Sequence, residues 1–92
     1  TLAYMSPEVL LQGAVDIASD IYAVGIIAYE FLTGAHPFNT SQVTELIHNI
    51  INKPLDVSTL PHDLGMIILK MTAKAPKERY ESADIALIEW AN

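Results

Sequence analysis

Few side chains in this sequence of 92 residues have the type and spacing that chemistry requires. The three histidines, His36, His48 and His62, include no pair four residues apart, so no two of them have the helical spacing of zinc ligands. None of them forms a convincing nucleophile–base pair with Ser19. The chain has no cysteine, which excludes disulfides, iron–sulfur clusters and thiolate metal sites. We therefore expect neither a metal site nor a nucleophilic catalyst among these residues.

The composition is more apolar than is usual for a chain of this length. Hydrophobic residues make up 51% of the sequence and charged residues 17%, whereas about 25% of a typical domain is charged. The length allows one small domain, whose core is limited. We expect the apolar excess to be covered either by oligomerisation or by the remainder of a larger domain.

Charge and hydropathy exclude two classes of partner. The formal net charge is -6, so the chain lacks the basic patch that nucleic acids and anionic lipids require. Its longest apolar stretch is shorter than the roughly 18 residues of a membrane span. We therefore expect no nucleic-acid partner and no membrane segment. The absence of cysteine fits a reducing compartment, and we expect the protein to be cytoplasmic.

Helix start and stop signals predict an all-α fold without strands. Ser6, followed by proline and glutamate, predicts the start of a short helix over 7–12 that Gly13 ends. The most apolar stretch has Ser19–Asp20 as a cap at its start and a glycine after it, which predicts a helix over 18–33. Because that stretch is apolar nearly all round, we expect this helix to be central and buried on most sides.

Three further helices complete the prediction of one short helix and four longer ones. Apolar residues at helical spacing from Val43 onward predict a helix that follows a capping box of Asn39 and Gln42. The same spacing predicts a helix over 62–74, with Lys74 in its last turn. Ser82 is expected to cap the last helix, which carries four residues on one face: Ala83, Ala86, Leu87 and Trp90.

Three motifs follow one another along the chain: TLAYMSPE, SDIYAVGIIAYEFLTGAHPF and KAPKERYESA. Their residues and spacing resemble the second half of the C-terminal lobe of protein kinases, over essentially the whole chain. The resemblance implies that residues 1–8 end the activation segment and include its substrate-docking P+1 loop. It also implies that residues 1–92 are one part of a kinase domain whose N-lobe and catalytic loop lie upstream.

The resemblance assigns substrate binding to the first four residues, Thr1, Leu2, Ala3 and Tyr4. Thr1 aligns with a threonine that is characteristic of Ser/Thr kinases, where tyrosine kinases usually carry proline. In the family, this hydroxyl bonds the catalytic aspartate and a nearby lysine, and so shapes the site that receives the substrate hydroxyl. Without the resemblance, Thr1 is a loop threonine with no assigned partner.

Three charged residues have structural roles in the family. The resemblance pairs Glu8 with Arg79, whose planar guanidinium can meet a carboxylate through two parallel hydrogen bonds. It makes Asp20 an acceptor for backbone N–H groups of the catalytic loop. By themselves, the same residues are compatible with two surface charges and an ordinary carboxylate at a helix start.

The resemblance implies a parent enzyme that transfers the γ-phosphoryl group of ATP to Ser or Thr of a protein substrate, with Mg²⁺. The family's Gly-rich loop, ATP-binding lysine, catalytic aspartate and metal-binding aspartate all precede the position of Thr1. No catalytic residue and no ATP or magnesium site is therefore expected in this chain, which alone should be inactive. Its expected partners are the protein substrate and the rest of the kinase domain, and the isolated chain is expected to self-associate.

Two alternatives stay open at this point. The protein could be a pseudokinase or kinase-like scaffold that keeps the helices and lacks phosphoryl transfer. It could also be an unrelated all-α interaction domain. The compact spacing and the KERYESA phrase resemble bacterial Ser/Thr kinases more than animal ones.

Overall fold

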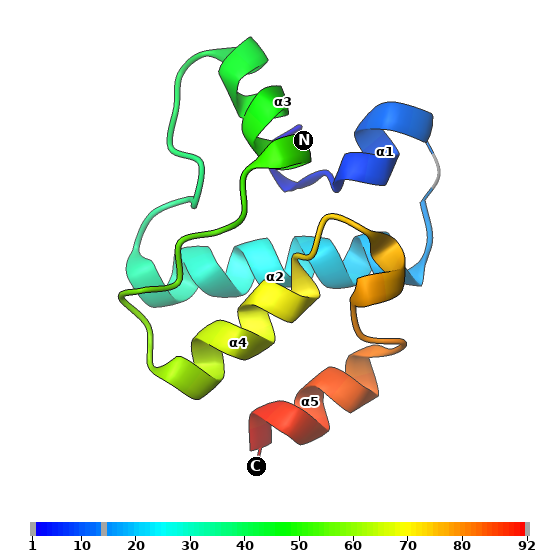
Figure 1. The fold of residues 1–92 in the computed structure, drawn as a ribbon, viewed down its shortest axis with the longest axis vertical. Helices are drawn as coiled ribbons and strands as arrows, with labels where there is room; N and C mark the ends of the chain where they lie inside the picture. The colour runs from blue at the N-terminus through cyan, green and yellow to red at the C-terminus, as the bar shows by residue number, and fades with distance from the viewer. Residues whose placement is uncertain (1, 14, 92) are drawn as a thin grey trace.

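A computed structural model describes residues 2–13 and 15–91, and over these ranges the chain is all-α and contains no strand (Figure 1). The predicted fold class is confirmed. Within the described residues, five α-helices are accompanied by two short 3-10 turns, η1 and η2. In chain order the elements are η1 Leu2–Tyr4, α1 Pro7–Gln12, α2 Ile17–Thr33, α3 Val43–Asn52, α4 His62–Met71, η2 Pro76–Glu78 and α5 Ala83–Ala91.

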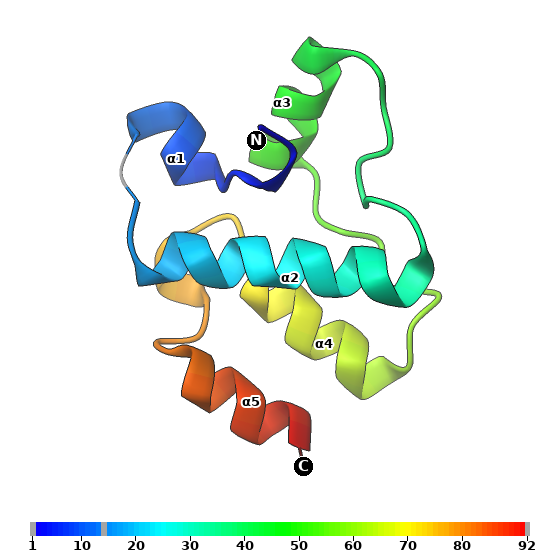
Figure 2. The same ribbon diagram turned by 180° about the vertical axis from the view of Figure 1, so that it is seen from behind.

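The longest helix, α2, runs across the middle of the molecule and organises the core. Helices α1 and α3 lie on one side of it, and α4 and α5 lie on the other, as both views show (Figures 1 and 2). Tyr22 and Ile26 of α2 are fully buried and join a core that continues with Phe38, Ile50, Leu55 and Ile68. The middle of α2 thus holds both halves of the fold together.

Local signals place the short first helix as predicted. Helix α1 covers residues 7–12, with proline at its start and Gly13 at its end in the left-handed conformation, at φ 70°. This conformation is strained for residues with a Cβ atom and open to glycine. The helix therefore begins and ends where its sequence indicates.

Helix α2 begins one residue earlier than predicted and uses a different cap. Oδ1 of Asp16 accepts hydrogen bonds from the backbone N–H groups of Ala18 and Ser19, at 2.9 and 3.3 Å. In return, Oγ of Ser19 accepts the backbone N–H of Asp16 at 2.9 Å. This reciprocal capping box satisfies donors at the helix start. The expected cap at Ser19–Asp20 is therefore wrong, because Ser19 is already inside the helix.

The capping box predicted before α3 is also wrong. The N-cap of α3 is Gln42, and its side chain makes no capping hydrogen bond. The backbone N–H of Gln42 instead donates to Oγ1 of Thr40 at 3.1 Å. This turn at Thr40 places the helix start beyond the reach of a cap at Asn39.

Helix α4 ends at Met71, with Thr72 as its C-cap, so the predicted extension to residue 74 is wrong. Lys74 lies beyond the helix, and its Nζ donates to the carbonyls of Asn49 and Ile50 at 3.3 and 2.8 Å. Both carbonyls belong to the C-terminal part of α3, where a cation is favourable. Lys74 therefore caps a neighbouring helix instead of its own.

One face of α2 stays exposed, although the apolar sequence predicts burial on most sides. Val24 and Ile27 are 52% and 54% exposed, and Phe31 is 86% exposed. Farther along α2 toward its N-terminus, an apolar groove of about 520 Å³ lies between α2 and α5 and includes Leu87 and Trp90. Over the described residues, no helix has the length and apolar character needed to span a membrane.

Candidate functional site

The first described residues form η1, a short turn held against the central helix. Oη of Tyr4 donates a hydrogen bond of 2.6 Å to Oε1 of Glu30, in the second half of α2. This hydrogen bond, together with burial and the negative charge of Glu30, raises the pKa of Tyr4. The bond connects the first sequence motif to the second.

A second contact holds the same turn through His36. Nε2 of His36 lies 2.8 Å from the carbonyl oxygen of Ala3, and Nδ1 of His36 accepts the backbone N–H of Phe38 at 3.0 Å. The rings of His36 and Tyr4 form a T-shaped pair, and their centroids are 5.6 Å apart. The turn is therefore fixed at two consecutive residues, Ala3 and Tyr4.

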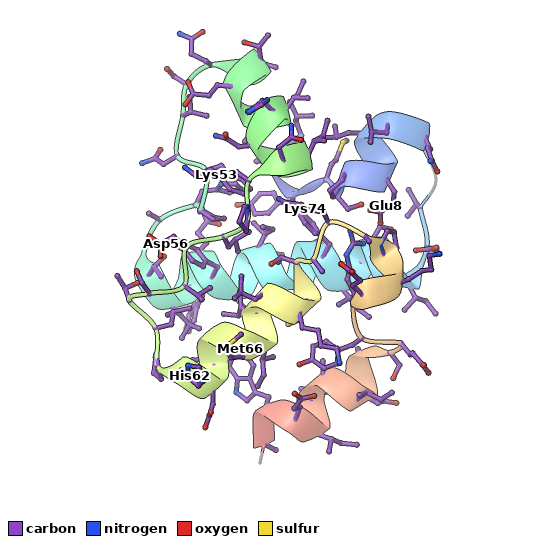
Figure 3. All side chains as sticks on the ribbon, in the orientation of Figure 1. Glu8, Lys53, Asp56, His62, Met66 and Lys74 are labelled. Atoms are coloured by element: carbon purple, nitrogen blue, oxygen red, sulfur yellow. The ribbon has the colours of Figure 1, made fainter. Side chains whose placement is uncertain are left out.

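The structure brings Glu8 and Arg79 together, although 71 positions separate them in the sequence. Nη1 and Nη2 of Arg79 donate to the two carboxylate oxygens of Glu8 at 2.7 and 2.8 Å, in a forked arrangement. None of the Arg79 side chain and 13% of the Glu8 side chain is exposed. Figure 3 shows Glu8 beside the turn that follows α4. The pair joins the first motif to the third.

Backbone groups complete the surroundings of Arg79. Its Nε donates to the carbonyl of Ala73 at 2.7 Å, and Nη1 also donates to the carbonyl of Ala18 at 3.0 Å. Nη2 donates to the carbonyl of Lys74 at 3.3 Å. One guanidinium thus bonds α1, the first turn of α2 and the segment after α4.

Burial and hydrogen bonding have opposite effects on the Glu8 carboxyl. Burial by itself raises the pKa of Glu8, because it disfavours the charged form. Hydrogen bonds from Arg79 and from the backbone of Glu8 outweigh it, and the resulting pKa lies below the ordinary value. The carboxylate is therefore held in its charged form at neutral pH.

Asp20 does not join this cluster. Its side chain is exposed and lies on the wall of the apolar groove between α2 and α5. Over the described part of the chain, its carboxylate has no hydrogen-bond partner. Thr1 lies outside the described residues, and Leu2 is half-buried within η1.

Residues 1–91 match the family profile of the protein kinase domain. This chain belongs to the protein kinase family. The family membership excludes the alternative of an unrelated all-α interaction domain.

Three relatives illustrate the match between this kinase chain and known proteins. The serine/threonine-protein kinase PknB of Mycobacterium tuberculosis is 38% identical over 88 residues, which cover 90% of this chain and 14% of PknB. Pkn1 of Myxococcus xanthus, also named a serine/threonine-protein kinase, is 39% identical over 87 residues, covering 89% of this chain and 13% of Pkn1. The hybrid signal transduction histidine kinase G of Dictyostelium discoideum is 39% identical over 90 residues, covering 90% of this chain and 3% of that protein. The chain thus spans a small part of each relative.

Protein kinases use ATP and Mg²⁺, but the donors described in this chain do not fit either group. Over residues 2–13 and 15–91, no three His, Asp or Glu side chains lie together in a way that could hold a metal ion. Gly13 and Gly34 end helices with positive φ, and Gly25 and Gly65 lie inside helices against neighbouring residues. The glycines therefore serve helix ends and close packing instead of a phosphate-binding loop.

Three residues that position this kinase segment were not predicted from the sequence: Glu30, His36 and Lys74. Glu30 and His36 both lie in the second motif, so their membership of that motif was the available signal. Nothing in their spacing indicates that they contact the first motif. Lys74 was assigned to the wrong helix, because its true partners are carbonyl groups of α3.

Proposed function

We propose that this chain is part of the C-terminal lobe of a serine/threonine protein kinase. The intact enzyme would transfer the γ-phosphoryl group of ATP to a Ser or Thr of a protein substrate, with Mg²⁺ as its metal. The names of the PknB and Pkn1 relatives support the serine/threonine class. Thr1 supports it as well, because it stands where Ser/Thr kinases carry threonine.

Within this proposal, the segment formed by Thr1 and η1 docks the substrate beside the acceptor hydroxyl, and the five helices provide its scaffold. The observation that carries the proposal is the pair of contacts joining the three motifs. Tyr4 binds Glu30 of the second motif, and Glu8 binds Arg79 of the third. A docking segment must be held rigidly, because a misplaced substrate loses much of the rate advantage of orientation.

Asp20 and Thr1 complete the proposal. We infer that Asp20 accepts hydrogen bonds from backbone N–H groups of the catalytic loop, and its exposed carboxylate beside an apolar groove is available for this. Thr1 would bond the catalytic aspartate of the same loop. Because the catalytic and ATP-binding groups belong to other segments of the kinase, the chain alone would transfer no phosphate.

The test is phosphoryl transfer by the intact protein that contains this chain. The purified protein is incubated with Mg²⁺-ATP and a general protein substrate, and the phosphorylated amino acids are identified. We expect phosphoserine and phosphothreonine from the intact protein and none from residues 1–92 alone. Thr1→Val should lower the turnover, whereas the matched variant Thr1→Ser should retain it.

Two outcomes would contradict the proposal. Phosphotyrosine as the main product would refute the serine/threonine class. A folded intact protein that transfers no phosphate would favour the kinase-like scaffold that lacks phosphoryl transfer.

A further inference from the structure

His36 connects the docking segment to the hydrophobic core through two hydrogen bonds. Its Nδ1 accepts the N–H of Phe38, and Phe38 is 4% exposed and packs in the same core as Tyr22 and Ile26. Its Nε2 lies 2.8 Å from the carbonyl oxygen of Ala3. The position of Ala3 is thus tied through one imidazole ring to a residue that the core holds in place.

The two partners of His36 determine which ring nitrogen carries the proton. A backbone N–H can only donate, so Nδ1 facing Phe38 must be unprotonated. A carbonyl oxygen can only accept, so Nε2 facing Ala3 must carry the hydrogen. The neutral ring with its proton on Nε2 is the one form of histidine that satisfies both bonds.

Protonation of His36 would place two donors opposite each other. The added hydrogen on Nδ1 would point at the N–H of Phe38 across 3.0 Å. That bond would be lost and replaced by repulsion, so the ring would have to turn away. Because the same ring holds Ala3, the docking segment would lose this contact and keep only the contacts of Tyr4 with Glu30 and the core.

The charged groups around His36 offer no replacement for the lost bond. On the η1 side, the rings of Tyr4 and His36 form a T-shaped pair, and Tyr4 gives its hydroxyl hydrogen to Glu30 of α2. On the core side, Nζ of Lys74 lies 5.1 Å from the centre of the Phe38 ring and carries a positive charge. Protonation of His36 would therefore add a positive charge next to Phe38, whose ring already faces the Lys74 ammonium.

We propose that His36 is a positioning residue that holds the substrate-docking segment only while its ring is neutral, so that substrate docking weakens in mild acid. This inference rests on the proposed kinase function for its effect on substrate, and on the two hydrogen bonds for its physical basis. An unperturbed histidine changes its charge between about pH 5 and 8, so this is the pH range in which the proposal is tested. The loss of one net hydrogen bond corresponds to about a two- to tenfold weakening of docking.

The first experiment measures the KM for the protein substrate and for ATP in the intact kinase, between pH 7.5 and 5.5. We expect the KM for the protein substrate to rise roughly two- to tenfold as the pH falls over this range. The KM for ATP should show only the pH dependence that groups other than His36 give it. His36→Asn retains an oxygen that can accept the N–H two residues later, as asparagine does in turns, and it does not titrate. This component of the pH profile should disappear in His36→Asn.

His62→Asn is the matched control for the loss of a histidine. His62 is exposed and begins α4, on the other side of α2 from the docking segment (Figures 2 and 3). The His62 variant should keep the pH profile of the wild type. If His36→Asn also keeps that profile, the positioning role of His36 is wrong.

Hydrogen exchange tests the two His36 hydrogen bonds independently of kinase activity. The backbone N–H of Phe38 in the intact protein should lose protection at pH 5.5, after correction for the intrinsic exchange rate, and His36→Asn should keep it. If the protection of the Phe38 N–H depends on pH equally in the wild type and in His36→Asn, the proposed role of His36 is wrong. A protein that shows the expected exchange of the Phe38 N–H but transfers no phosphate would instead refute the proposed kinase function. Failure of the His36 proposal and failure of the proposed function are therefore distinguishable.

Discussion

Replacing Arg79 with alanine tests how strongly the motifs of this kinase chain are held together. The substitution removes five hydrogen bonds: two to the carboxylate of Glu8 and three to backbone carbonyls. It also removes the guanidinium that lies 5.1 Å from the centre of the Tyr22 ring. Glu8 would then lose the main hydrogen-bond partner of its carboxylate.

The magnitude follows from the burial of the pair. The Arg79 side chain is not exposed at all, and 13% of the Glu8 side chain is exposed. Deleting one partner of a buried ion pair costs about 3–5 kcal/mol, whereas an exposed pair contributes roughly 0–1 kcal/mol. At roughly 2–4 °C per kcal/mol for a domain of 150–250 residues, the melting temperature should fall by about 6–20 °C.

The assay is thermal and urea denaturation of the intact protein, comparing Arg79→Ala with Lys77→Ala. Lys77 is a suitable control because it is a cation on the neighbouring turn η2 and is exposed. Its removal should change the free energy of unfolding by no more than about 0.5 kcal/mol. A melting temperature of Arg79→Ala that equals that of Lys77→Ala would refute the view that the pair is buried and stabilising.

Acid titration provides a second measurement of the same pair. Because Arg79 holds the pKa of folded Glu8 below its ordinary value of 4.5, the pair contributes its full stability above that value. The contribution should be lost as the pH falls below 4.5, through the lower pKa of the folded state. The stability difference between the wild type and Glu8→Gln should therefore shrink in acid, and a constant difference would contradict this linkage.

Two further substitutions test the packing of the helices. Gly25→Ala should destabilise the intact protein by about 1–3 kcal/mol in urea denaturation, because the new Cβ would lie 2.6 Å from Cγ2 of Thr72. Gly65→Ala should cost less, since its Cβ meets the side chain of Val57 at 3.1 Å, and an equal cost would contradict the steric reason. Burial lowers the pKa of Lys74 to about 8, so the unfolded state binds more protons than the folded state between this value and 10.5. The stability of the wild type relative to Lys74→Met should therefore rise over that pH range, and parallel denaturation profiles would show that the pKa is not lowered.

Local signals in the sequence predicted where several helices begin and end. The proline after Ser6 and the glycine at residue 13 bound α1, and Ser82 precedes α5 and accepts the N–H of Ile85 at 3.3 Å. The predictions failed for the caps of α2 and α3 and for the end of α4. Asp16 and Ser19 form the box that begins α2, and this outcome depends on backbone geometry that the sequence pattern leaves open.

The candidate site was only partly accessible to sequence reasoning. The pairing of Glu8 with Arg79 was predicted from the family resemblance, and spacing alone gave no reason to join residues so far apart. The contacts of His36 with Ala3 and of Lys74 with α3 were not predicted. Each of them depends on the path of the chain around α2.

The sequence by itself determined that this chain is helical, where most of its helices lie and that its apolar content exceeds what a small core can bury. These properties arise from interactions between residues three or four positions apart and from composition, so they can be read without the fold. Only the tertiary structure decided which face of α2 stays exposed, which helix Lys74 caps, and how Arg79 binds α1 and His36 binds η1. Those contacts join residues 24 to 71 positions apart. They form only after the helices have packed, because a hydrogen bond requires its two atoms to lie within about 3 Å.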